Sequence, residues 1–105
     1  MVSADGAARN EDLFRDVNDR IQRLAADMLV DDLARYVCEC VDLGCLTQIR
    51  ATQDEYAEVR RRPVLFLVAP GHVDERYERV VMRTDRFEVV EKLGVAGAVA
   101  EKLDA

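Results

Sequence analysis

All three cysteines of this chain lie within eight residues of one another, and its only histidine follows a Pro-Gly pair. Thiolate sulfur and imidazole nitrogen are the donors that Zn²⁺ prefers, and a structural zinc site takes four of them in a tetrahedron. The chain has no spare cysteine or histidine elsewhere. The sequence therefore predicts a closed, structural Zn²⁺ site with Cys38, Cys40, Cys45 and His72 as ligands, and no catalytic residues.

The spacing C-x-C-x₄-C, with a histidine 27 residues further on, is uncommon for zinc, so other interpretations of these residues stay open. Cys38 and Cys45 can be small core residues, with His72 an ordinary turn residue. An iron–sulfur cluster usually takes four cysteines, and a redox thiol usually offers C-x-x-C on a thioredoxin-like frame. Both of these patterns are missing from the chain.

A catalytic metal would need an open coordination position and a general base nearby. Glu39, Asp42 and Asp74 are the candidates for that base. Four available ligands favour a filled coordination shell instead. If one position is open or one thiolate is exchangeable, the alternative function is a small metalloenzyme, or a thiol-based redox or metal sensor, that uses the same Cys/His cluster.

The cysteines must be positioned by a turn between two extended segments. In an extended chain Cys38 and Cys40 point to the same side, because they are two residues apart. Gly44 permits the reversal that precedes Cys45. We expect a small hairpin, with one strand over 35–38 and the other over 46–51, that carries the cysteines at its tip like a zinc knuckle.

The histidine must be positioned by the apolar run over 64–69, which has the pattern of a strand buried on both faces. We expect this strand to be the centre of the sheet, with His72 held just past its end. Segments 78–84 and 87–92 alternate apolar and polar residues and predict a hairpin that completes an antiparallel sheet.

Two helices are predicted before these strands. Apolar residues recur at helical spacing over about 11–29, and we expect that face to pack on the core. Thr52 to Glu55 has the form of a capping box, which predicts a helix over about 53–61. The expected core-facing residues of the first helix are Phe14, Val17, Ile21, Leu24 and Met28, with Arg15, Asp16, Asn18, Asp19, Gln22 and Arg23 on the opposite face.

Composition narrows the class of protein. The chain has 105 residues, a net charge of −6 and 50% hydrophobic residues, which suits a single globular domain. Acidic charge disfavours nucleic acid and anionic membranes as partners, and no apolar run approaches the 18 residues of a membrane span. The run Arg60 to Arg62 is interpreted as cations at a helix C-terminus. We expect a cytoplasmic protein.

Four segments together are similar to a group of small Cys/His-containing proteins of high-GC bacteria to which no activity is assigned. The resemblance covers most of the chain from Leu13 to Leu93 and implies a shared Cys/His module. The segments that carry it are Phe14 to Ile21, Val37 to Cys40 with Cys45, Val68 to His72, and Val89 to Lys92.

These observations predict an α+β fold in which a long N-terminal helix packs on a small antiparallel sheet. The expected organisation is a flexible leader over 1–9, a single domain over 10–93, and a marginal helix or frayed tail over 94–105. The expected function is a small non-enzymatic, zinc-stabilised binding or adaptor module. Its expected partner is a protein, with the chain a monomer or a homodimer through the N-terminal helix.

Overall fold

The computed structural model describes residues 4–25, 32–42 and 44–104. Helices and strands share one hydrophobic core, so the α+β class is confirmed. None of the described helices has the length and apolarity needed to cross a lipid bilayer. In chain order the elements are α1 (Ala4–Leu24), β1 (Ala34–Val37), β2 (Gln48–Ala51), α2 (Gln53–Val59), β3 (Leu65–Val68), β4 (Glu78–Arg83), β5 (Glu88–Lys92) and α3 (Gly94–Asp104).

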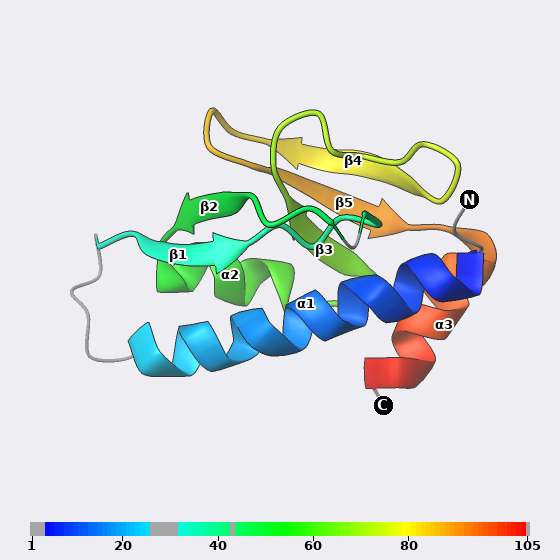
Figure 1. The fold of residues 1–105 in the computed structure, drawn as a ribbon, viewed down its shortest axis with the longest axis horizontal. Coiled ribbons are helices and arrows are strands. Elements are labelled where there is room, and N and C mark those ends of the chain that lie inside the picture. Colours follow the sequence, from blue (N-terminus) through cyan, green and yellow to red (C-terminus); the bar gives the residue numbers. More distant parts are fainter. Residues whose placement is uncertain (1–3, 26–31, 43, 105) are drawn as a thin grey trace.

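The strands form two small antiparallel sheets. Strands β1 and β2 pair with each other, and β3, β5 and β4 form a second sheet in that order. Figure 1 shows α1 running along one side of the molecule, with β1 beside its C-terminal part and α3 beside its N-terminal part. The two predicted hairpins, β1–β2 and β4–β5, are confirmed.

The prediction that the apolar strand is the centre of the sheet is wrong, because β5 is central and β3 lies at an edge. Strand β3 is nevertheless buried, since its free edge is covered by polar groups from elsewhere in the chain. Leu67 donates to the Glu39 carboxylate and accepts from the Glu39 N–H, and the Leu65 carbonyl accepts from Arg15. The backbone of Glu39 and the side chains of Glu39 and Arg15 therefore take the place of a neighbouring strand, and the apolar residues of β3 can be buried although it lies at a sheet edge.

The face of α1 that meets the core also differs from the predicted face. Phe14 and Ile21 pack on the core as expected, but Val17 is 40% exposed and Leu24 is 84% exposed. Arg15 and Asn18, which were expected to face solvent, are buried. Met28 lies outside the described residues.

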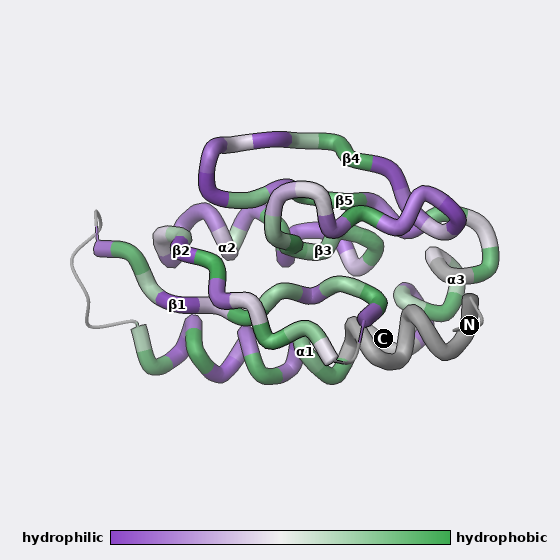
Figure 2. Tube along the Cα trace, turned by 45° about the horizontal axis from the view of Figure 1, so that its top comes forward, coloured by the Kyte–Doolittle hydropathy of each residue, from purple (hydrophilic) through white to green (hydrophobic). Residues whose placement is uncertain are grey.

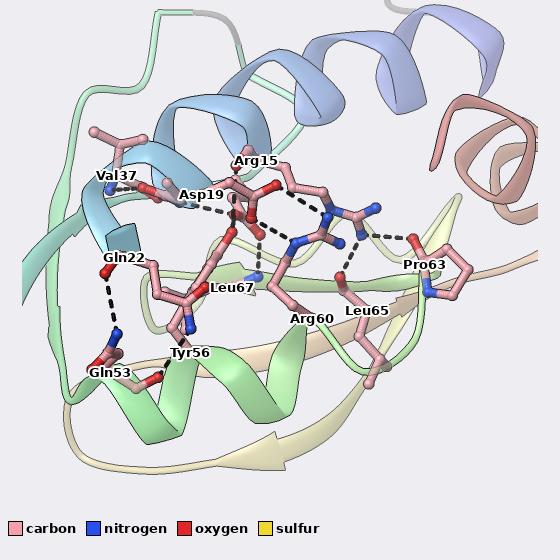
Figure 3. Close-up of polar contacts among 12 residues, drawn as sticks. Arg15, Asp19, Gln22, Val37, Gln53, Tyr56, Arg60, Pro63, Leu65 and Leu67 are labelled. Carbon is pink, nitrogen blue, oxygen red and sulfur yellow. Dashed lines mark hydrogen bonds and ion pairs between the residues drawn. The ribbon is translucent and has the colours of Figure 1, made fainter. Parts of the chain in front are cut away.

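The change of face on α1 has a physical cause. Polar groups on the edges of β1 and β3 need hydrogen-bond partners once they are buried, and α1 supplies those partners. Figure 3 shows the side chains of Arg15, Asp19 and Gln22 directed toward β3, toward Arg60 just after α2, and toward Gln53 of α2. Figure 2 shows hydrophilic and hydrophobic residues alternating along this part of α1.

The capping box at α2 is confirmed in full. Thr52 Oγ1 accepts from the N–H of Glu55, and Glu55 Oε1 accepts from the N–H of Thr52. Helix α2 ends at Val59, slightly before the predicted end. Each arginine of the following run is paired with an acidic side chain: Arg60 with Asp19, Arg61 with Glu58 and Arg62 with Glu91.

Helix α3 packs tightly against the end of β5 at Gly97. A Cβ added at this glycine would lie 2.8 Å from the carbonyl oxygen of Lys92. A glycine that weakens the helix in isolation therefore permits its close approach to the sheet. The prediction of a long N-terminal helix is not confirmed, because the side chains of α1 are described only from Leu13 onward. The predicted domain boundaries also stay predictions.

Candidate metal centre

The four predicted ligands come together although they lie on different segments. Cys38 and Cys40 follow β1, Cys45 lies on the return toward β2, and His72 lies in the turn after β3. One ligand atom from each residue lies within 4.8 Å of every other, and no other such group of cysteine, histidine and acidic residues is found among the described residues. The structure thus brings the whole predicted set to one place.

The distances suit a tetrahedral metal. Zinc bonds of about 2.3 Å to sulfur and about 2.0 Å to nitrogen give tetrahedron edges of about 3.8 Å between sulfurs and about 3.5 Å between nitrogen and sulfur. His72 Nδ1 lies 3.5 Å from Cys38 Sγ and also 3.5 Å from Cys45 Sγ. The imidazole therefore presents the nitrogen nearer its backbone at the distance that shared coordination needs.

Cys38 and Cys40 are held by the core of the protein. Both are buried, and the N–H of Cys38 donates to the Thr47 carbonyl, which extends the β1–β2 pairing by one step. The Cys38 sulfur also accepts a hydrogen bond of 3.2 Å from the N–H of Ala69, at the end of β3. A backbone N–H aimed at a sulfur favours its thiolate form, which is the form that binds metal.

Cys45 and His72 are held by turns. The N–H of Cys45 donates to the Asp42 carbonyl, and Asp42 Oδ1 accepts from the N–H of Gly44. The N–H of His72 donates to the Ala69 carbonyl, and Gly71 has a φ of 82°, which a residue with a Cβ rarely adopts. The Pro-Gly turn predicted from the sequence therefore orients the histidine.

The thiols influence one another's protonation. The pKa of the Cys40 thiol is lowered to about 5, chiefly because the Cys38 thiol donates a hydrogen bond to it. The pKa of Cys38 is raised, first by the same hydrogen bond and then by burial. The hydrogen bond between the two thiols therefore favours the thiolate form of Cys40, which is the form that binds metal.

Glu39, which lies between two of the predicted ligands, is completely buried, and its carboxylate is not part of the ligand group. Its Oε1 accepts from the N–H of Leu67 at 2.8 Å, and its Oε2 accepts from Asn18 Nδ2 at 2.8 Å and from the Tyr56 hydroxyl at 2.7 Å. These donors come from β3, α1 and α2. One carboxylate thus ties the segment of the C-x-C pair to three other elements.

Burial raises the pKa of Glu39, and its three hydrogen bonds partly oppose that rise. Asn18 completes the arrangement, since its side-chain amide donates to the Val37 carbonyl and accepts from the Val37 N–H. Alternation along an extended segment could have placed Glu39 opposite the two cysteines. Nothing in the sequence indicated that Asn18, Tyr56 and Leu67 would meet it.

No protein-family model matches this chain, and neither a curated protein nor a solved structure is significantly similar to it. The resemblance to small proteins of high-GC bacteria stays a prediction.

The three candidate general bases are engaged in other contacts. Glu39 faces the core, as described above, and Asp42 Oδ1 accepts from the Gly44 N–H. Both oxygens of Asp74 accept from the Arg76 guanidinium, which lowers the pKa of this carboxyl. An open hollow of about 570 Å³ beside the cluster is lined by Cys40 to Asp42 and by Gly71 to Arg76. Asp42 and Asp74, which line this hollow, thus serve a turn and an ion pair.

Proposed function

We propose that this protein is a small non-enzymatic binding module whose fold is stabilised by one Zn²⁺ bound to Cys38, Cys40, Cys45 and His72. The observation that carries the proposal is the placement of one imidazole nitrogen 3.5 Å from each of two thiol sulfurs. A set of three thiolates and one imidazole favours zinc over magnesium or calcium, which prefer oxygen ligands.

A structural role follows from what the site would join. The metal would link the turn between β1 and β2 to the end of β3, two segments that belong to different sheets. Four protein donors fill a tetrahedral shell and leave no position for substrate. The engagement of Glu39 and Asp74 in other contacts also argues against a catalytic metal.

A binding role is supported by apolar side chains left exposed on α1. Leu13, Val17 and Leu24 are 57%, 40% and 84% exposed, and their spacing places them on one face of the helix. We propose that this face meets a protein partner, a second copy of the chain included. The acidic net charge and the pairing of Arg60 to Arg62 with carboxylates favour a protein over nucleic acid.

Metal analysis of the protein purified without added metal tests this proposal. We expect about one zinc per chain in the wild type, and loss of zinc together with lowered stability in Cys40→Ser and His72→Ala. Glu75→Gln is the matched control, because Glu75 is an exposed acid that lines the neighbouring hollow and is not in the ligand set. A folded wild type with no bound metal, and no gain in stability on zinc addition, would contradict the proposal.

A further inference from the structure

Two of the four donors of the candidate metal centre are buried in the core, and the other two lie on partly exposed turns. Cys38 is 0% and Cys40 is 3% exposed, and the residue between them is anchored at three points in the core. Cys45 and His72 are only partly buried and lie on turns. Cys45 is therefore the most exposed of the three cysteines.

The sulfur atoms also differ in whether they contact the backbone or only side chains. Cys38 Sγ accepts from the backbone N–H of Ala69, which occupies a lone pair and ties the sulfur to β3. Cys45 Sγ has a side-chain contact of 3.4 Å to Thr47 Oγ1, a hydroxyl that can rotate away. Cys45 Sγ also lies 3.5 Å from His72 Nδ1, so its contacts are all to side chains, whereas Cys38 Sγ and Cys40 Sγ each contact a backbone group, the Ala69 N–H and the Asp42 carbonyl.

We propose that Cys45 is a peroxide-reactive cysteine, and that its oxidation to a disulfide with Cys40 releases the metal from the site. This inference rests on the proposed zinc function and adds a redox regulation to it. Two thiolates are lost as ligands in one event, so only Cys38 and His72 remain, and two ligands do not hold a structural zinc.

The chemistry needs a peroxide as oxidant and balances with two electrons. The Cys45 thiolate attacks one peroxide oxygen, the O–O bond breaks, and hydroxide leaves as Cys45 becomes a sulfenic acid. The Cys40 thiolate then attacks the Cys45 sulfur, the S–O bond breaks, and a second hydroxide leaves as the S–S bond forms. The two thiolates lose two electrons, the peroxide gains them, and the zinc keeps its oxidation state.

Cys40 is the expected partner for two geometric reasons. Its sulfur lies within 4.8 Å of the Cys45 sulfur, and it lines the open hollow beside the site, whereas Cys38 does not. A disulfide between Cys38 and Cys40 would require rotation of an extended segment that Glu39 holds in place. The chain between Cys40 and Cys45 is a turn, in which a short covalent loop can close.

The test begins with zinc-loaded wild-type protein whose zinc content is measured before hydrogen peroxide is added. Zinc release is then followed with a coloured zinc indicator. We expect peroxide to release the zinc, and a thiol reductant with added zinc to restore the bound state. In Cys45→His, which keeps a zinc donor and removes the reactive sulfur, we expect release to be at least about tenfold slower.

The disulfide is located by proteolysis of the oxidised wild type. Cleavage after Arg35 and Glu39 and before Asp42 places each cysteine on a separate peptide, so that mass spectrometry distinguishes all three pairings. A Cys40 to Cys45 link supports the proposal. A link that includes Cys38, or zinc retained under peroxide, overturns it.

Two further outcomes separate this inference from the proposed function. A wild type that binds zinc and keeps it under peroxide overturns the redox step and leaves the zinc module intact. A wild type without zinc overturns the proposed function. If Cys45→His does not fold, alkylation of zinc-loaded wild type decides instead: Cys45 must be labelled before Cys38 and Cys40, and any other order overturns the assignment.

Discussion

At the scale of single residues, two tyrosines in the core differ in the hydrogen bonding of their hydroxyls: that of Tyr56 meets Glu39 at 2.7 Å and, more weakly, the Arg15 carbonyl at 3.5 Å. The rings of Tyr36 and Tyr56 are stacked, with centroids 4.5 Å apart and planes 15° apart, and both side chains are buried. The Tyr56 hydroxyl donates to Glu39 Oε2, whereas the Tyr36 hydroxyl has no hydrogen-bond partner among the described residues. Removing each hydroxyl in turn therefore compares the loss of a hydrogen-bonded hydroxyl with the loss of a hydroxyl that has no hydrogen-bond partner.

We expect Tyr56→Phe to lower the free energy of unfolding by about 1–3 kcal/mol, because it removes a hydrogen bond to a buried carboxylate. Tyr36→Phe is the matched control, since it makes the same chemical change in the same ring stack. It should be neutral or stabilising, because it removes a buried hydroxyl without a partner. Urea unfolding of both variants measures the difference, and equal effects would contradict the assigned role of Glu39.

At the scale of elements, one ion pair connects three segments. Glu55, in the first turn of α2, accepts from Arg86 at 3.0 Å and 2.7 Å, and Arg86 also donates to the Arg50 carbonyl of β2. Arg86 lies in the connection between β4 and β5. The pair therefore ties the N-terminus of α2 to both sheets.

The Arg86 guanidinium lowers the pKa of Glu55 below its ordinary value of 4.5. A lowered folded-state pKa contributes stability that is fully present above the ordinary value and is lost as pH falls through the folded value. We therefore expect Arg86→Ala to lower the urea midpoint at pH 7, and the difference from wild type to shrink below about pH 4.5.

Arg61→Ala is the control for this pH experiment. Arg61 also pairs with a glutamate, Glu58, at 3.2 Å, but both side chains are largely exposed. Exposed pairs contribute little to stability, so this variant should stay close to wild type at every pH. A pH-independent deficit in Arg86→Ala would show that its loss acts through packing and not through the charge of Glu55.

At the scale of the whole molecule, the candidate metal centre lies between the two sheets. Cys38 and Cys40 belong to the main hydrophobic core, and the turn that carries His72 follows β3 directly. If zinc binds the folded chain, stability must depend on the concentration of free zinc. We expect the free energy of unfolding to rise by about 1.4 kcal/mol per tenfold increase in free zinc above the dissociation constant.

Unfolding in zinc-buffered solutions measures this dependence. His72→Ala serves as the comparison, because it removes one ligand from a partly exposed turn and leaves the three thiols in place. Its stability should respond far less to zinc than that of the wild type. An identical response in both proteins would place zinc elsewhere on the chain.

Local features could be predicted from the sequence because their partners lie close in the chain. The capping box of Thr52 and Glu55 spans four residues, and the β4–β5 hairpin joins neighbouring segments. The grouping of the cysteines with His72 was also predictable, but for a different reason: the chain has only three cysteines and one histidine, so a Cys/His site could draw on no others.

The sequence by itself therefore determined the α+β class, the short elements and the identity of the donors that come together. Only the tertiary structure decided which side of α1 is buried and why β3 can lie at a sheet edge. Arg15 donates to the carbonyls of Pro63 and Leu65, and Glu39 bonds to Leu67. A polar residue is buried when its partners are backbone groups of distant segments, and hydropathy along the chain does not record where those groups will lie.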